Sequence, residues 1–312
     1  MGARNEDFVI SRVFAAPPAL VFAAWTDAKH LAAWFGPHGF TGRAEIDARA
    51  GGSFRMVIVA PNGVEFPLKG RFLEIVPSQR IVYTSDMSEH PDEWHDRVDP
   101  RRDRSKPKPA YECETTVTFE PIDDKTLLTV RVRFPSSDVR DRFAGMDEGW
   151  SQGFERLASR LAGEEPSADA SGREIRSSRL LAAPRELVWR MWTEREHIGK
   201  WYGPKGFSLT IHSMDVRPGG VWSFVMHGPD GRDYDNKVLY LELEAPSRIR
   251  YSHVNDPLHH TTVTLTAEGD KTRLDMHMLF DSAKLRDRVA KEHGAVEGME
   301  QTLSRLAEAL SR

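Results

Sequence analysis

Residues 12 to 40, RVFAAPPALVFAAWTDAKHLAAWFGPHGF, return at residues 179 to 207 as RLLAAPRELVWRMWTEREHIGKWYGPKGF. Fourteen of the 29 aligned positions are identical at a constant offset of 167 residues. The match continues with one added residue in the second copy, where DVRPGG at 215–220 answers to DARAGG at 47–52. Solenoid and propeller repeats span roughly 20–50 residues. A repeat of about 150 residues therefore indicates a tandem duplication of a whole domain.

The length of the chain agrees with two domains, because 312 residues exceed what one average domain contains. The stretch GEEPSADASG at 163–172 is polar, rich in Pro, Gly and Ser, and lacks a hydrophobic period, which is typical of a linker. We therefore predict a first domain at residues 1–163, a linker at 164–172 and a second domain at 173–312. Each domain is long enough to bury a core or a cavity of its own.

The charge balance argues against a nucleic-acid partner. The chain has 43 Lys and Arg against 47 Asp and Glu, a formal charge of −4. A phosphate-binding surface requires an excess of basic residues. We therefore expect no nucleic-acid partner.

The single cysteine and the N-terminus indicate the compartment. One cysteine, Cys113, rules out an intrachain disulfide framework and fits a reducing environment. We expect it to be a small buried hydrophobe on a strand. The first ten residues, MGARNEDFVI, contain no apolar signal region, and the chain has no run of 18 apolar residues. These features predict a soluble cytoplasmic protein with no membrane contact.

Each copy begins with a strand followed by two short helices. Residues 8–14 alternate apolar and polar side chains as a strand does. Pro17 or Pro184 then stands where the first turn of a helix tolerates proline. A second short helix ends in WFGP at 34–37 or WYGP at 201–204, since Gly-Pro stops a helix.

Six further segments with a period of two follow in each copy, separated by short turns, which predicts an antiparallel sheet. They are 42–48, 53–60, 66–76, 79–87, 111–120 and 125–134 in the first copy, and 207–216, 220–227, 233–245, 248–254, 260–267 and 271–280 in the second.

A long helix is expected at the end of each copy, because apolar residues recur there at helical spacing. Its apolar stripe comprises Phe143, Met146, Trp150, Phe154, Leu157 and Leu161, or Leu285, Val289, Val296, Met299, Leu303, Leu306 and Leu310. Glycines interrupt this pattern at 145, 149, 153, 294 and 298, although each costs a helix about 1 kcal/mol relative to alanine. Either the helix approaches its neighbours closely, or the glycines leave room for a ligand beside Trp150 and Met299.

The motifs of the two copies identify a family resemblance. They are Pro17…Val21…Trp25-Thr26, Trp34-Phe35-Gly36-Pro37, Asp47-x-Arg49-x-Gly51-Gly52 and Gly149-Trp150…Leu157, each with a counterpart in the second copy. With this order of elements the chain resembles the START and birch-pollen-allergen (SRPBCC) superfamily. Within it, the chain resembles the branch named for the C-terminal domain of the activator of heat-shock-protein-90 ATPase. The resemblance implies an α+β chain of two tandem helix-grip domains. In each, a curved antiparallel sheet wraps around a long C-terminal helix, with two short helices after the first strand.

Strand parity predicts which side chains face inward. In the first copy they are Phe54, Met56, Ile58, Leu73, Ile75, Tyr83, Val117, Phe119, Val130 and Val132; in the second they are Trp222, Phe224, Met226, Leu241, Leu243, Tyr251, Val263, Leu265, Met276 and Met278. This face and the terminal helix enclose either a packed core or a ligand cavity, which periodicity does not separate.

The candidate cavity residues combine this face with the tryptophans of the short helices and with the terminal helices. They are Trp25, Trp34, Phe54, Met56, Tyr83, Trp150, Phe154, Trp192, Trp201, Trp222, Phe224, Tyr251, His253, Met276, Met278, Met299 and Leu303. Tryptophans repeated in both copies also fit a structural role. We expect the Asp-x-Arg-x-Gly-Gly motif to be architectural, forming a tight turn.

The histidines do not form a metal motif. His90 and His95 lie near acids, and His253, His259 and His260 lie close together, but neither set has the spacing of a zinc site. The charged segment 88–110 is typical of a solvated, mobile insertion. His253 falls on the inner face where the first copy has Ser85. We expect no metal and no cofactor.

Three functions remain open. The first hypothesis is a non-enzymatic protein that binds a small hydrophobic molecule, with the second copy the better candidate. The second, which the resemblance implies, is a chaperone-interaction module, although no region resembles the separate chaperone-binding domain of the eukaryotic activator. The third is an enzyme similar to the polyketide cyclases and aromatases of the superfamily, with His253, Tyr251 and His227 as acid-base candidates. No nucleophile, phosphate-loop or dinucleotide motif occurs, so no catalytic residue is assigned.

Overall fold

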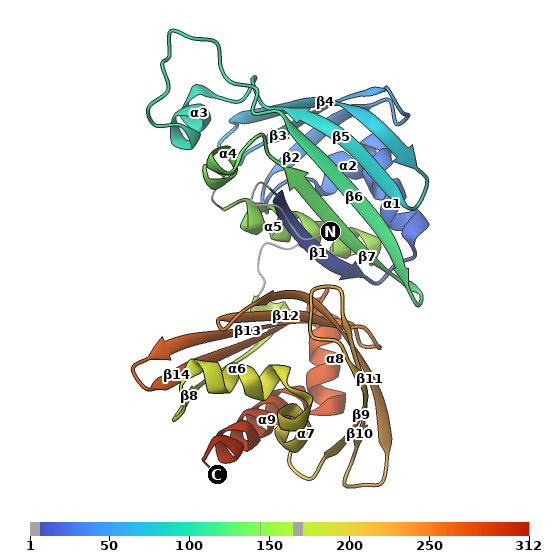
Figure 1. Ribbon diagram of the computed structural model, residues 1–312. Coiled ribbons are helices and arrows are strands. Elements are labelled where there is room, and N and C mark those ends of the chain that lie inside the picture. Colours follow the sequence, from blue (N-terminus) through green and yellow to red (C-terminus); the bar gives the residue numbers. More distant parts are fainter. Residues whose placement is uncertain (1–6, 144, 165–170, 312) are drawn as a thin grey trace. The chain divides into compact units, whose positions relative to one another are not determined.

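The computed structural model describes residues 7–143, 145–164 and 171–311. The chain divides into two compact units, residues 1–168 and 169–312, which are described separately (Figure 1). Residues 165–170 of the expected linker lie outside the described part of the chain. The domain boundaries at 163 and 173 stay a prediction.

The first unit is one antiparallel sheet of seven strands, in the order β1-β7-β6-β5-β4-β3-β2, curved around its last helix (Figure 1). The strands are β1 (Asp7–Phe14), β2 (Thr41–Ile46), β3 (Ser53–Val59), β4 (Glu65–Val76), β5 (Arg80–Asp86), β6 (Cys113–Ile122) and β7 (Lys125–Arg133). The helices are α1 (Pro18–Thr26), α2 (Ala28–Trp34), α3 (Asp92–Val98), α4 (Ser137–Asp141) and α5 (Met146–Leu161).

The second unit repeats this plan, with seven strands in the order β8-β14-β13-β12-β11-β10-β9. They are β8 (Glu174–Leu181), β9 (Ser208–Met214), β10 (Val221–His227), β11 (Asp233–Glu244), β12 (Arg248–His253), β13 (His259–Glu268) and β14 (Lys271–Leu279). Its helices are α6 (Arg185–Thr193), α7 (Arg195–Trp201), α8 (Ala283–His293) and α9 (Ala295–Leu310), preceded by a short 3-10 turn at Ser171–Arg173. The predicted α+β architecture of two tandem helix-grip domains is confirmed.

The terminal helix differs from the expectation, because it is broken once in each unit. Gly145 separates α4 from α5 with a φ of 85°, and Gly294 separates α8 from α9 with a φ of 58°. Only glycine takes such angles at little cost. The expectation of one unbroken helix is therefore wrong, and these two glycines form the joint.

The sequence offers two explanations for the other helical glycines: close approach of the helix to its neighbours, or room for a ligand. Both occur. A side chain added at Gly149 would meet nothing within 4 Å, whereas one at Gly153 would lie 3.7 Å from the backbone oxygen of Gly36. A side chain at Gly298 would lie 3.4 Å from Pro204. Gly149 thus leaves open space, while Gly153 and Gly298 allow contact with the Gly-Pro corner.

A β-bulge changes the predicted parity of one strand in each unit. The pairing with the next strand shifts between Phe72 and Glu74, and again between Tyr240 and Glu242. Phe72 and Tyr240 are consequently buried, whereas Leu73 is 51% exposed. The inward placement of Leu73 is wrong, because a bulge inserts one residue and reverses the alternation beyond it.

The insertion at 88–110 is more ordered than its composition indicates. It contains helix α3, and both of its histidines are buried, His90 at 7% exposure and His95 at 0%. Trp94 contacts both rings, with centroids 4.4 Å from that of His90 and 5.0 Å from that of His95. The expectation of a solvated histidine cluster is wrong, since Trp94 provides an apolar anchor that overall charge composition does not report.

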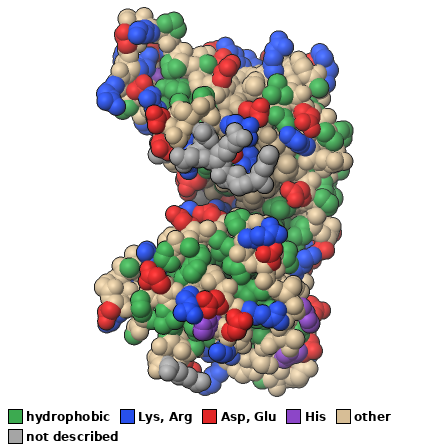
Figure 2. Space-filling view, in the orientation of Figure 1, with side chains coloured by type: hydrophobic (Ala, Val, Ile, Leu, Met, Phe, Trp, Pro, Cys, Tyr) green, Lys and Arg blue, Asp and Glu red, His purple; other side chains and the backbone are tan. Residues whose placement is uncertain are grey.

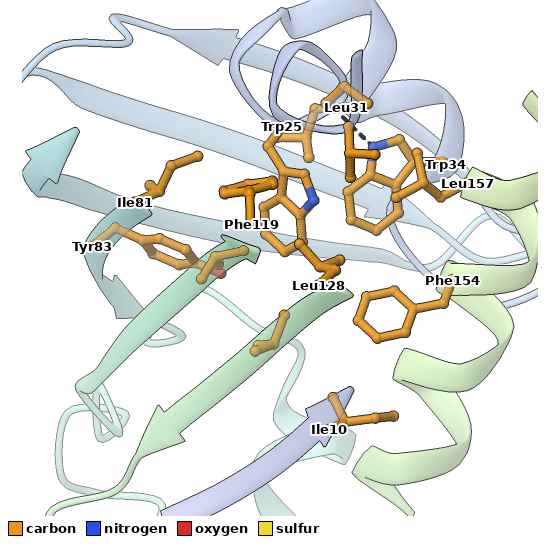
Figure 3. Packing of buried hydrophobic residues seen from close by; sticks show 14 of the residues in the cluster. Ile10, Trp25, Leu31, Trp34, Ile81, Tyr83, Phe119, Leu128, Phe154 and Leu157 are labelled. Carbon is orange, nitrogen blue, oxygen red and sulfur yellow. Dashed lines mark hydrogen bonds between the residues drawn. The ribbon is translucent and has the colours of Figure 1, made fainter. Parts of the chain in front are cut away.

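The tryptophans of the short helices form the centre of each core. Trp25 and Trp34 lie side by side, with ring centroids 5.0 Å apart (Figure 3). Trp34 donates its indole N–H to the backbone oxygen of Ala24 at 2.9 Å, and Trp201 donates to Met191 at the same distance. Each bond ties α2 or α7 to the helix before it. Cys113 is buried on β6, as expected.

The Asp-x-Arg-x-Gly-Gly motif forms a tight turn, as the sequence predicts. Arg49 pairs with Asp47 at 2.9 Å on the surface. Gly51 donates its N–H to Phe72 and Gly52 accepts from the same residue, at 2.8 and 2.9 Å. A side chain at Gly52 would lie 2.1 Å from the backbone oxygen of Asp47, so only glycine fits. The second copy repeats these contacts.

An arginine, buried in the first unit and partly buried in the second, connects each terminal helix to the end of the second short helix. Arg156 donates to the backbone oxygens of Ala33, Gly36 and Pro37, at 2.9, 3.1 and 2.8 Å. Arg305 makes the same connection in the second unit, where it donates to residues 200, 203, 204 and 207 at 2.9 to 3.4 Å. The guanidinium thereby satisfies helix-end carbonyls that have no partner within the helix.

We predict that each unit folds alone. Fragments 1–164 and 169–312 should both be soluble and unfold cooperatively, because each contains a complete sheet and core cluster. The second fragment includes the 3-10 turn, since Arg173 accepts a backbone hydrogen bond from Phe280. Urea unfolding followed by circular dichroism tests this. A fragment without a cooperative transition would show that the two units need each other.

We further predict that Arg156→Met lowers the free energy of unfolding by about 2–4 kcal/mol, since removing the guanidinium leaves several carbonyl oxygens without their donor. The control is Arg160→Met, which changes an exposed arginine of the same helix. The urea midpoint of fragment 1–164 provides the measurement. Equal effects of the two variants would contradict a structural role for the Arg156 contacts.

Candidate ligand cavities

Each unit contains a cavity between its sheet and its terminal helices. The first has a volume of about 290 Å³ and the second about 430 Å³. Both are lined by the Gly-Pro corner after the second short helix and by inner-face strand residues, together with Phe143 and α5 in the first unit and α8 and α9 in the second. The predicted inner face therefore surrounds a cavity as well as a packed core.

The structure separates the candidate residues into three groups. Those that line the larger cavities are Trp34, Tyr83 and Trp150 in the first unit and Tyr251, His253, Met276, Met278 and Met299 in the second. Those that line a void of about 30 Å³ in the first unit are Trp25, Phe54, Met56 and again Tyr83. Those that pack in the cores are Phe154, Trp192, Trp201, Trp222, Phe224 and Leu303.

The first cavity is narrowed by aromatic rings. Trp150 stacks on Trp25, with centroids 5.9 Å apart and an interplanar angle of 18°, and it contacts Phe35 edge to face at 5.6 Å. Trp94 of the insertion and Phe143 also line this cavity, with centroids 5.7 Å apart. Large rings thus occupy space on both sides of it.

The second cavity is larger, and its wall is built from methionines where the first unit has one of these rings and two valines. Met299 stands where the first unit has Trp150, next to the repeated glycine. Met276 and Met278 stand where the first unit has Val130 and Val132, at the same positions in the strand pairing. Methionine adapts its shape to irregular space. The second wall is therefore deformable.

Four hydrogen-bonding residues in and around the second cavity were not among the predicted candidates. They are Tyr202, Asn236, Tyr240 and His259. Tyr202 lies in a loop, where strand alternation does not apply. The bulge in β11 reverses the alternation, so that periodicity does not place Tyr240 on the inner face. Aligning the two copies would have found them, because the first copy has apolar residues or cysteine at the equivalent positions.

A pair of stacked histidines forms one end of the second cavity. The rings of His253 and His259 lie 4.8 Å apart at 14° to each other. Nε2 of His253 lies 2.7 Å from Oδ1 of Asn236, whose amide nitrogen donates to Tyr234. Nε2 therefore carries the proton and donates it to the amide oxygen.

Burial keeps both rings uncharged. It lowers the pKa of His253 to about 4, and burial together with the neighbouring His253 lowers the pKa of His259 to about 3. His259 donates from Nδ1 to the backbone oxygen of Pro257 at 3.1 Å. Its Nε2 is then an acceptor.

Tyrosine hydroxyls gather at the adjacent layer of the cavity. Tyr202 and Tyr251 have hydroxyl oxygens 3.5 Å apart. Burial raises the pKa of both, and that of Tyr251 lies well above the ordinary value. Tyr240 packs behind Tyr251 with ring centroids 6.5 Å apart. All three hydroxyls are therefore protonated near neutral pH.

The acid-base candidates do not share one site. His227 lies on the exposed face of β10, where it bonds Asp233 at 2.6 Å and Thr210 at 2.8 Å. Met226, its neighbour, lines the cavity with Tyr251 and His253. His227 therefore does not reach a molecule in the cavity.

The described residues offer few other sites. No group of three or more His, Cys, Asp or Glu side chains among them could hold a metal ion. Within the same ranges, no helix is long and apolar enough to span a membrane. On the face shown in Figure 2, basic and acidic side chains are interspersed, without a large patch of one sign.

A protein-family model described as Activator of Hsp90 ATPase homolog 1-like protein matches the chain twice, at residues 15–162 and 182–311. No curated protein matches the chain.

Solved structures similar to the chain are mostly of one repeat in length. A protein from Nitrosomonas europaea is 28% identical, with 45% of this chain and 96% of that chain covered and a TM-score of 0.41. The AHSA1 protein from Silicibacter pomeroyi is 24% identical, with coverages of 50% and 97% and a TM-score of 0.39. DynU16, from the dynemicin biosynthetic locus, is 18% identical, with coverages of 98% and 99% and a TM-score of 0.37.

We predict that His253 and His259 stay neutral in the folded chain down to about pH 5, because their pKa values are lowered to about 4 and 3. In the unfolded chain histidine binds protons near pH 6.5. The free energy of unfolding should therefore fall as the pH drops below about 6.5, and this contribution should level off near the folded pKa values.

Histidine Cε1–Hε1 NMR shifts, assigned with His253→Gln and His259→Gln, measure both pKa values directly. The urea-unfolded chain is the control and should titrate near pH 6.5. Titration of either ring near pH 6.5 in the folded protein would show that the pair is solvated.

Proposed function

The chain belongs to the family of Activator of Hsp90 ATPase homolog 1-like proteins, and we propose that it is a non-enzymatic binder of a small hydrophobic molecule, held in the second-domain cavity. The observation that carries the proposal is this cavity of about 430 Å³ between the sheet and helices α8 and α9. Small-molecule sites have volumes of roughly 300–1,000 Å³ and mostly apolar walls with a few polar groups.

The composition of the wall supports a binding role. Its apolar part includes Met226, Met276, Met278 and Met299, and its polar part includes Tyr251. Methionines form adaptable contacts with apolar surfaces. Such a wall suits an apolar molecule that is oriented by a small number of hydrogen bonds.

The first domain is the weaker candidate for the same role. Its cavity is about 290 Å³, and Trp150 and Trp94 take up space that is open in the second domain. The duplication therefore allows one copy to bind a ligand while the other contributes a different property.

Interaction with a chaperone is a second candidate, which the description of the family favours. A pull-down and an ATPase assay with the cognate chaperone of the Hsp90 type test it. Stimulation of the ATPase by the full chain would support this function independently of the cavity.

We predict that an apolar fluorescent probe binds the full chain saturably and that Gly298→Leu and Met299→Trp each weaken its binding about tenfold or more. Both substitutions fill cavity volume, since both residues line it. Met299→Trp introduces the residue that the first domain carries at the equivalent position, so the fold has a precedent for it. Probe fluorescence during titration is the measurement.

The control is Glu308→Leu, which adds the same apolar side chain to the exposed face of α9. It should bind the probe as the unchanged protein does. Unchanged binding in folded Gly298→Leu and Met299→Trp proteins would place the probe elsewhere and refute the cavity assignment.

A further inference from the structure

Because the two domains share one fold, their cavities can be compared position by position. Tyr83 and Tyr251 occupy the same place, since each pairs across the sheet with a threonine, Thr115 or Thr261. Around this shared tyrosine, five positions differ in the hydrogen-bonding groups of their side chains. The first copy has Phe35, Leu68, Phe72, Ser85 and Cys113 where the second has Tyr202, Asn236, Tyr240, His253 and His259.

These replacements make the second cavity richer in hydrogen-bonding groups than the first. Tyr202, Asn236, His253 and His259 all line it. Buried polar groups are costly unless they find partners. Asn236, His253 and His259 have partners within the protein, but the contact between the hydroxyls of Tyr202 and Tyr251 is long, at 3.5 Å. The concentration of these groups in one copy therefore favours a ligand with polar atoms.

The tyrosine pair indicates that the polar atom of the ligand is a hydrogen-bond acceptor. The hydroxyl oxygens of Tyr202 and Tyr251 are 3.5 Å apart, whereas hydroxyl hydrogen bonds are usually about 2.5–3.0 Å long. The two hydroxyls therefore bind each other weakly. A single acceptor oxygen within reach of both could take two shorter hydrogen bonds from them.

The charges around the cavity disfavour an anion at this position. Of the described residues that line it, none is Lys or Arg, while Asp235, Asp256 and Glu292 are acidic; His293 lies beside Glu292 on α8. His253 and His259 are neutral, as described above. Burying an anion without a cationic partner is expensive. The buried end of the ligand is therefore uncharged.

We propose that the second-domain cavity selects an uncharged, largely apolar molecule with an acceptor oxygen, such as a ketone, which the hydroxyls of Tyr202 and Tyr251 bind. This inference rests on the proposed function, because it presupposes that the cavity holds a small molecule. The first domain lacks one of the two donors, since Phe35 stands in place of Tyr202.

Three probes of one shape test the proposal with the full chain. 2-Acetylnaphthalene carries a ketone, 2-isopropenylnaphthalene replaces its oxygen with a CH₂ group, and 2-naphthoate carries a negative charge. Equilibrium dialysis should give an affinity for the ketone about 25-fold higher than for the hydrocarbon, which corresponds to two net hydrogen bonds of about fivefold each. The carboxylate should bind about tenfold more weakly than the ketone or not at all.

Three Tyr→Phe variants locate the donors. Tyr202→Phe and Tyr251→Phe should each lower the affinity for the ketone about fivefold and leave that for the hydrocarbon unchanged. The matched control is Tyr240→Phe, which makes the same chemical change behind the cavity wall and should alter neither affinity.

The outcomes separate this inference from the function on which it rests. If neither uncharged probe binds the unchanged protein, both proposals fail. If both bind equally and no Tyr→Phe variant discriminates between them, the cavity binds apolar molecules and the selection by an acceptor oxygen is refuted. Preferential binding of 2-naphthoate would likewise overturn it. An equal loss of both probes in Tyr202→Phe and Tyr251→Phe would assign both hydroxyls a structural role and refute the selection by an acceptor oxygen.

Discussion

One guanidinium in each domain, buried in the first and partly buried in the second, connects the elements that meet where the cavity forms. Arg156 and Arg305 connect the terminal helix to the carbonyl oxygens of the Gly-Pro corner, at distances of 2.8 to 3.4 Å. The corner, the glycines of the helix and the sheet are the three walls of each cavity. Because a charged donor must keep its acceptors when it is buried, this contact sets how closely the helix approaches the corner.

The two domains share one fold but have different interiors. The contacts that repeat in both copies are structural: the arginine of the terminal helix, the indole bond of Trp34 and Trp201, and the glycine turn. The residues that differ lie around the cavities, where rings in the first copy give way to methionines, tyrosines and histidines in the second. A shared fold does not define a shared function, which depends on the site. The arrangement is consistent with a duplicated scaffold in which one interior has diverged.

The periodicity of the sequence was sufficient to predict most of the strands and helices. Each wrong prediction has a local cause. The described strands and the two short helices after the first strand of each copy were predicted, since alternation and helical spacing report which residues share a face. Helix α3 was not predicted. The bulge at Leu73 reversed the alternation of β4. The equivalent bulge in β11 is the reason that Tyr240 was overlooked. The break at Gly145 and the burial of His95 depend on a backbone angle and on one packing contact, and neither leaves a periodic signal.

The sequence by itself determined the duplication, the α+β class and the inward face of each sheet, because these follow from repetition and from the spacing of apolar residues. Only the tertiary structure decided that this face surrounds a cavity, and that the second cavity is the larger, about 430 against 290 Å³. Volume depends on how side chains from distant segments fill the space between them, as Trp25 and Trp150 do in the first domain. A one-dimensional pattern records which residues are buried, but it does not record the space that remains between them.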